Sequence, residues 1–134
     1  MAFMDLKDIL ERNPELTLKD LQQFQGRYDE RFVDSKFTTS LQKVEHTYAH
    51  MGKLLGRLAA YVEAREEGRE FSAEEIREKV IPDLLVYSAW LAEVFGVDME
   101  RAYLSRIVGN LERLYSDKIS ADEFEEIERM IKER

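Results

Sequence analysis

The sequence predicts an all-α fold, and three observations lead to that prediction. Apolar residues recur at intervals of three and four along most of the chain. No segment keeps the two-residue alternation with β-branched enrichment that is typical of a strand. The 134 residues include only 6 glycines and 2 prolines, so long helices meet few interruptions. The length suits one domain, and we expect a single helical domain over 1–134, with a core over about 17–115 and an acidic helix over about 120–134.

The bulk composition narrows the classes of function. A net charge of −8 argues against general binding to nucleic acids or anionic membranes, because these partners attract basic surfaces. The absence of cysteine excludes disulfides and thiolate metal sites. The first residues, MAFMDLKDILER, lack the basic start and long apolar run of a signal peptide, and no stretch approaches about 18 apolar residues. We therefore expect a cytoplasmic protein that binds neither nucleic acid nor membrane.

The first helices are predicted from their caps and breaks. Asn13-Pro14 is expected to end a short N-terminal helix, because proline disfavours helical backbone at the preceding residue. Thr17 and Asp20 then have the spacing of a capping box at the start of the next helix. Its apolar residues continue at helical spacing: Leu18, Leu21, Phe24, Tyr28 and Phe32.

The longest helix is predicted over about Ser40 to Glu66. Seven apolar residues alternate in steps of three and four: Leu41, Val44, Tyr48, Met51, Leu55, Leu58 and Val62. Such a seam is typical of packing, so we interpret it as core. A stripe of small residues lies beside it: Ala49, Gly52, Gly56 and Ala60. Small side chains let another helix approach closely, and glycine inside a helix costs about 1 kcal/mol relative to alanine, which indicates packing or function.

The next helix is expected to start with a capping box at Ser72 and Glu75 and to be disturbed near Ile81, because Pro82 removes a hydrogen bond and crowds the preceding turn. One side of this helix is apolar: Ile76, Val80, Leu84, Tyr87, Leu91 and Val94. Gly96 suits its C-cap.

Two further helices are predicted after Gly96. Asp98 is a suitable N-cap for the first, whose expected buried face consists of Met99, Ala102, Tyr103, Ile107, Leu111 and Leu114. Ser120 and Glu123 form a capping box for the second, with a narrow apolar stripe of Phe124, Ile127 and Ile131. The chain thus reads as a bundle of four main helices with a smaller helix at each end. Because its apolar faces are wide, we expect a homodimer or tetramer.

The stretch FGVDMERAYLSRIVGNLER, residues 95–113, is the most informative for function. It places Arg106, Asn110 and Arg113 at i, i+4 and i+7 on one helix face, where two cations flank an amide and could grip an anion. Together with I-P-D-L-L-x-Y and LA-x-x-x-G-x-D, this stripe resembles the end of the MazG-like all-α nucleoside triphosphate pyrophosphatases. The resemblance covers about 95 residues, from Leu18 to Tyr115.

The resemblance implies a magnesium-dependent cleavage of nucleoside triphosphates to monophosphates and pyrophosphate. The family holds magnesium with E-E-x-x-E on one helix and E-x-x-D at the start of the next, since clustered carboxylates suit this ion. Only the last aspartate is retained, as Asp83; the other family carboxylates fall on Ala49, His50, Lys53 and Val80. The resemblance also implies that Arg106, Asn110 and Arg113 lie near the phosphates. Magnesium is thus expected only if the protein is active.

A basic stripe of His46, His50, Lys53 and Arg57 stands near the positions of the missing carboxylates. It could bind phosphate without metal, with Lys53 pairing with Asp83, or it could be an ordinary solvated face. His46 and His50 at i, i+4 could instead chelate a transition metal, with Asp83 or Glu45 as a third ligand. The aromatic residues Tyr48, Tyr87, Trp90 and Tyr103 could stack on a base, or form core or subunit interface.

Two hypotheses for function follow. In the first, the protein is a MazG-like pyrophosphohydrolase with impaired or altered catalysis. In the second, it is a non-catalytic module that binds a nucleotide or another phosphorylated molecule, or that assembles as a structural oligomer. The candidate site residues are Asp83 for metal and His50, Lys53, Arg106, Asn110 and Arg113 for phosphate.

Overall fold

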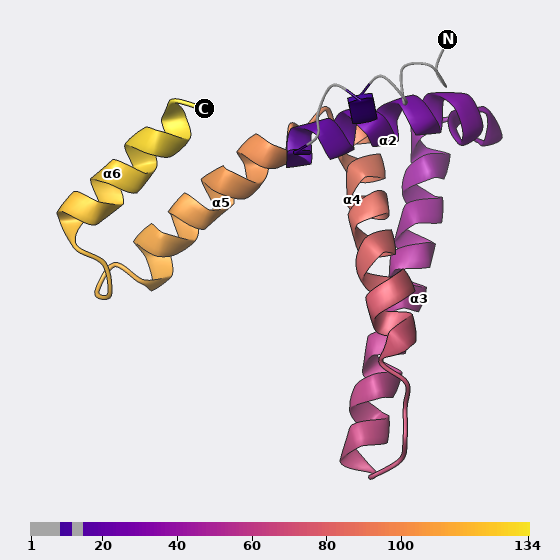
Figure 1. Cartoon of the computed structure of the whole chain (residues 1–134). Coiled ribbons are helices and arrows are strands. Elements are labelled where there is room, and N and C mark those ends of the chain that lie inside the picture. The colour runs from indigo at the N-terminus through magenta and orange to yellow at the C-terminus, as the bar shows by residue number, and fades with distance from the viewer. Residues whose placement is uncertain (1–8, 12–14) are drawn as a thin grey trace. The chain divides into compact units, whose positions relative to one another are not determined.

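The computed structural model describes residues 9–11 and 15–134, and every regular element in these residues is a helix (Figure 1). The all-α class predicted from the sequence is therefore confirmed. The predicted break at Asn13-Pro14 lies outside the described residues. No single helix in the described ranges has the length and apolar character to span a membrane; one bent pair, Ile76–Phe95 with Met99–Leu114, meets the length and composition criteria only jointly.

The chain divides into two compact units, one ending at Val97 and one covering Asp98–Arg134. The elements of the first unit are α2 (Leu18–Phe32), a 3-10 turn (Asp34–Lys36), α3 (Ser40–Glu66), a π-helical turn (Ile76–Val80) and α4 (Ile81–Phe95). The second unit contains α5 (Met99–Leu114) and α6 (Ala121–Lys132). The single domain expected from the length stays a prediction.

Local capping explains where most helices begin and end. The Thr17 hydroxyl accepts a hydrogen bond from the Asp20 N–H at 3.1 Å, and the Asp20 carboxylate accepts one from the Thr17 N–H at 2.9 Å, which completes the predicted capping box of α2. The side chains of Asp98 and Ser120 cap α5 and α6. Gly96 ends α4 with φ of 65°, a left-handed conformation that glycine adopts without steric cost.

The segment before α4 differs in detail from the prediction. The Ser72 hydroxyl accepts a hydrogen bond from the N–H of Glu74 at 3.2 Å, rather than from Glu75 as the capping-box spacing predicted. The α-helical pattern changes at Ile81, as expected from Pro82, and the turn before it is π-helical. Proline lacks an N–H, so it is best tolerated at the start of the following α-helix.

In the first unit, α3 and α4 pack side by side, and α2 packs against α4 (Figure 1). The buried apolar residues of this unit come mainly from α3, the π-helical turn and α4: Leu54, Ala64, Val80, Ala89, Trp90 and Ala92. The predicted apolar side of the helix after Ser72 is broadly confirmed, since Val80 is fully buried and its other members are half-buried.

The seam predicted as the core of α3 is not the core. Leu41, Tyr48, Leu55 and Val62 are exposed, and Val44, Met51 and Leu58 are only half-buried. The residues of α3 that are buried are Lys43, Thr47, Leu54 and Ala64. The prediction was wrong because α4 packs on the opposite side of α3, where a second set of residues has the same spacing of three and four.

The face of α5 predicted to be buried is also largely exposed. Ala102, Tyr103, Ile107 and Leu114 are exposed, while Met99 and Leu111 are half-buried. Within the second unit α5 packs on α6, and one helical neighbour covers only part of a helix surface. A pocket of about 220 Å³ lies where they meet, and its apolar lining includes Leu111, Ile119 and Phe124.

Candidate functional site

The two histidines of α3 lie at its contact with α4. Their ring centroids are 4.2 Å apart, as expected for i, i+4 residues on one helix face. The His46 ring stacks on Trp90 with centroids 5.8 Å apart, and the His50 ring stacks on Tyr87 at 5.5 Å. Tyr87 and Trp90 also contact each other edge to face at 5.1 Å. The histidines therefore form part of an aromatic cluster whose other members are Tyr87 and Trp90 of α4 and Phe37 of the segment before α3.

Several basic groups gather around His46. The pKa of His46 is lowered below its ordinary value, first by burial and then by the nearby charges of His50, Lys36 and Lys53. We call these four residues, Lys36, His46, His50 and Lys53, the basic face. Arg57, the fourth member of the predicted stripe, forms an ion pair with Glu75 instead.

Asp83 is exposed near the start of α4, one turn before Tyr87. The pKa of Tyr87 is raised, first by burial and then by the charge of Asp83, which places this carboxylate near the aromatic cluster. The contacts of the described residues include no ion pair between Lys53 and Asp83, so the pairing considered from the sequence is not formed in this structure.

The residues Arg106, Asn110 and Arg113 all lie on α5, in the second unit. Arg113 Nη2 donates a hydrogen bond to Asn110 Oδ1 at 3.2 Å, and both arginines are exposed. The predicted stripe is therefore present as a surface feature in which one arginine is already linked to the amide.

The residues present do not fit the magnesium site that the family resemblance implies. The described chain contains no group of three or more histidine, aspartate or glutamate side chains arranged to hold a metal ion. Val80, at the position of a family glutamate, is an apolar side chain with no exposed surface. No histidine pair with a third acidic ligand is formed among the described residues either, so the alternative of a transition-metal site is not supported by their arrangement.

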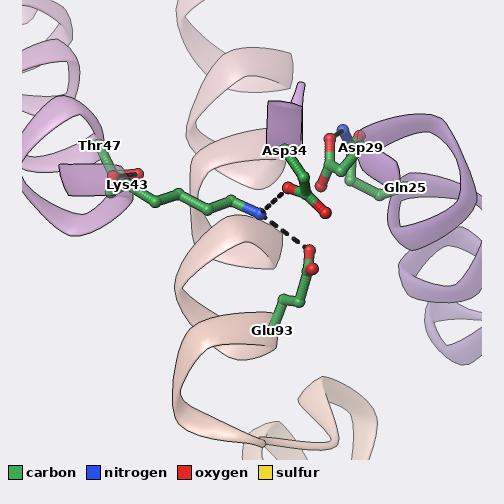
Figure 2. A network of polar contacts seen from close by, with 6 residues as sticks. All are labelled: Gln25, Asp29, Asp34, Lys43, Thr47 and Glu93. Carbon is green, nitrogen blue, oxygen red and sulfur yellow. Dashed lines mark hydrogen bonds and ion pairs between the residues drawn. The ribbon is translucent and has the colours of Figure 1, made fainter. Parts of the chain in front are cut away.

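Figure 2 shows a polar network that the sequence did not predict. It lies beside the aromatic cluster, because Lys43 contacts Trp90. The Lys43 side chain extends from α3, and its ammonium donates hydrogen bonds to Asp34 Oδ1 at 2.8 Å and Glu93 Oε2 at 2.9 Å. The same ammonium lies 5.5 Å from the centroid of the Trp90 ring, within the range of a cation–π contact. Lys43 thus connects α3 with α4 and with the turn that follows α2.

The pKa of Lys43 reflects two opposing effects. Its side chain is only 7% exposed, and burial alone would lower the pKa. The hydrogen bonds and negative charges of Asp34 and Glu93 outweigh burial, so the pKa of Lys43 is raised and the side chain stays charged. A buried lysine with two carboxylate partners is satisfied, whereas an unpaired one would be costly.

Asp29 on α2 lies near this network and, like Thr47, is fully buried (Figure 2). Its Oδ1 accepts a hydrogen bond from Gln25 Nε2 at 2.7 Å, but Oδ2 has no hydrogen-bond partner among the residues that the structure describes. Burial raises the pKa of Asp29 to about 6, against the lowering effects of Gln25 and Lys43. Asp29 therefore titrates much closer to neutrality than an ordinary aspartate.

An open pocket of about 320 Å³ adjoins the network. Its polar lining consists of Asp34, Lys43 and Glu93 together with the hydroxyl residues Thr38, Thr39 and Ser40 at the start of α3. The carboxylates already neutralise the lysine, so the pocket offers little net attraction for an anion. We interpret the network as a connection between helices rather than as a ligand site.

The sequence carried only a weak signal for this network. Lys43 and Thr47 are one turn apart on α3, and the Thr47 hydroxyl donates a hydrogen bond to the Lys43 carbonyl at 2.7 Å. In the sequence, where the position of α4 is unknown, both residues resemble those of an ordinary solvated helix face. The partners of Lys43, Asp34 and Glu93, are 59 residues apart in the chain, and no local pattern links them. Only the packing of α3 on α4 brings these charges together.

Comparison with known proteins does not assign the chain to a family. No protein-family model matches the chain, and no curated protein or solved structure matches it either.

Proposed function

We propose that the protein is a divergent relative of the MazG-like pyrophosphatases that binds a phosphorylated small molecule on its basic face without magnesium-dependent cleavage. A MazG-like bundle that assembles as a homo-oligomer is the fold that accompanies this proposal. The single observation that supports it most is the concentration of cations at His46. Lys36, His50 and Lys53 are all close enough to lower the pKa of His46, in a chain with a net charge of −8.

The chemistry of such a face suits a phosphate group. Charge-assisted hydrogen bonds from ammonium and imidazolium groups to phosphate oxygens are stronger than neutral ones. Burial is the first cause of the lowered pKa of His46, and a bound dianion would offset the second, which is repulsion by the nearby basic groups. Binding and protonation of His46 should therefore strengthen each other. Tyr87 and Trp90 provide apolar rings beside the cations, against which a base or sugar of a nucleotide could pack.

Arg106, Asn110 and Arg113 are a second, separate proposed contact for phosphate. They lie on α5, and the exposed guanidinium of Arg106 is the least constrained member of the stripe. Arginine binds phosphate oxygens through a planar pair of donors, which a lysine does not offer.

The test is calorimetric titration with inorganic phosphate, AMP and ATP in the absence of magnesium. We expect Lys53→Gln to weaken binding about tenfold, or ~1.4 kcal/mol. The matched control Lys132→Gln on α6 should weaken binding less. We also expect phosphate to raise the pKa of His46 in proton NMR titrations. No binding of any of the three ligands at millimolar concentration would rule out the basic face as a phosphate site.

The non-catalytic part of the proposal has its own test. Pyrophosphate release from a panel of nucleoside triphosphates with magnesium or manganese should stay at background. Turnover at an ordinary enzymatic rate that Asp83→Ala abolishes would show that the protein is an active pyrophosphohydrolase.

A further inference from the structure

The side of α3 that faces away from α4 carries a row of exposed large side chains. Leu41, Tyr48, Leu55 and Val62 recur every seven residues and are 66%, 76%, 58% and 52% exposed. Isolated exposed apolar residues are common, but four in register along one helix form a contiguous surface. Such a surface, in a chain with so many charged residues, indicates a binding partner.

Smaller or acidic residues alternate with these four. Glu45, Gly52, Ala59 and Glu66 each follow a large residue by four positions, and all four are exposed. With 3.6 residues per turn, these eight residues occupy a stripe about 100° wide and about 37 Å long. The spacing of four and three is that of a coiled-coil contact. We call these eight residues the outer seam.

The rest of the chain gives no reason for the glycine in this seam. A Cβ added at Gly52 would meet nothing within 4 Å, so no close approach within the described chain requires glycine there. Glycine inside a helix nevertheless costs about 1 kcal/mol relative to alanine. A small residue at this place is useful if a side chain from another molecule packs against it.

We propose that a second copy of this chain packs on the outer seam, with the two α3 helices antiparallel. In the arrangement that uses all eight positions, Tyr48 of one copy faces Ala59 of the other, and Gly52 faces Leu55. Every central layer then pairs a large residue with a small one, which keeps the helix separation uniform. Glu45 faces Val62 and Glu66 faces Leu41 in the outer layers, where a carboxylate can reach water.

A parallel pair would fit much less well. It would place Gly52 against Gly52 and Tyr48 against Tyr48, so that adjacent layers would be alternately empty and overfilled. It would also oppose Glu45 to Glu45 and Glu66 to Glu66, and like charges directly opposite each other are unfavourable. Shape and charge therefore both favour the antiparallel pair.

This proposal is independent of phosphate binding. His46, His50 and Lys53 are displaced from the outer seam by well over 90° around α3, at 100° per residue. Two copies joined through the outer seam leave the basic face open. Loss of the dimer would therefore leave phosphate binding on the basic face untouched, and absence of phosphate binding would leave the dimer untouched.

The first part of the test is the oligomeric state, measured by light scattering over a wide concentration range. We expect a dimer for the natural chain. We expect Gly52→Leu to be monomeric although its circular dichroism stays helical, because leucine fills open space in one chain but collides with Leu55 of a second copy. Lys79→Gln, which lies outside α3 and removes one charge, should remain dimeric. A natural chain that is monomeric throughout, or a Gly52→Leu variant that dimerises like it, would overturn the proposal.

The second part of the test is the orientation of the pair. The chain contains no cysteine, so single cysteines can be introduced without interference. Under mild oxidation, a mixture of Tyr48→Cys and Ala59→Cys should form a disulfide-linked heterodimer, whereas each variant alone should cross-link poorly. We expect light scattering of the reduced variants to show that both still dimerise. Efficient cross-linking of Tyr48→Cys or Ala59→Cys to itself would show that the helices are parallel.

Discussion

The two faces of α3 reverse the usual relation between polarity and burial. The face against α4 contains Lys43, Thr47, Leu54 and Ala64, of which two are polar, and all are buried. The outer seam contains four large apolar residues that are more than half exposed. The polar face is stable because Lys43 and Thr47 are hydrogen-bonded, whereas the large side chains of the outer seam are mostly exposed. Apolar periodicity alone thus did not tell which face of α3 packs against α4.

The first prediction compares two adjacent leucines, one on each face of α3, and concerns the greatest change in the free energy of unfolding. Leu54 is 6% exposed and Leu55 is 58% exposed. We expect Leu54→Ala to lower the free energy of unfolding by about 3 kcal/mol, because it leaves a cavity between α3 and α4. Leu55→Ala should change it by less than about 0.5 kcal/mol when the outer seam is blocked by Gly52→Leu. Urea unfolding of both variants in that background measures the difference, and equal values would mean that the two faces do not differ as described.

The second effect concerns the charge in the polar face. We expect Lys43→Met to lower the free energy of unfolding by about 2 kcal/mol, because Asp34 and Glu93 lose their shared partner. Both carboxylates are partly exposed, which limits the cost. Lys53→Met on the exposed surface is the matched control and should change stability by less than about 0.5 kcal/mol. If denaturant unfolding gives the same value for the two variants, the network contributes nothing to stability.

The third prediction concerns Asp29, whose substitution should change the free energy of unfolding by an amount and with a sign that depend on pH. The pKa of Asp29 is about 6 in the folded chain and 3.8 in the reference state, so the folded state binds more protons between these values. Its contribution to stability therefore falls as pH rises, by about 1.4 kcal/mol per pH unit across this window. Asp29→Asn should stabilise the protein by about 1 to 2 kcal/mol at pH 7.5 and destabilise it by about 1 to 2 kcal/mol below pH 4, since asparagine keeps an acceptor for Gln25 but introduces a buried amide whose cost does not depend on pH.

Thermal and urea unfolding at several pH values measure this effect. Asp117→Asn, in the exposed loop before α6, is the control for a change of one charge. A gain from Asp29→Asn that does not vary between pH 4 and 7.5 would show that Asp29 is not the titrating group.

The smallest effect is electrostatic and concerns the basic face. Removing the charge in Lys53→Gln should raise the pKa of His46 toward its ordinary value, because one of the nearby cations is lost. Histidine proton shifts followed by NMR through the titration report this change directly. A pKa of His46 that does not move would place Lys53 outside the basic face.

Local sequence patterns are enough to predict the helices and most of their ends. The bounds of α3, the capping box of Thr17 and Asp20, the caps at Asp98 and Ser120 and the C-cap at Gly96 all follow from contacts within a few residues. Such contacts are local, so the pattern of residue types is enough to predict them.

Tertiary structure decided which faces are buried and which charges meet. The apolar row of Leu41, Tyr48, Leu55 and Val62 and the buried row of Lys43, Thr47 and Leu54 both follow the helical repeat, so periodicity alone does not tell which row is buried. The position of α4 selects the second row for burial. It also brings Glu93 to a lysine that lies 50 residues earlier in the chain, a contact that no sequence pattern encodes.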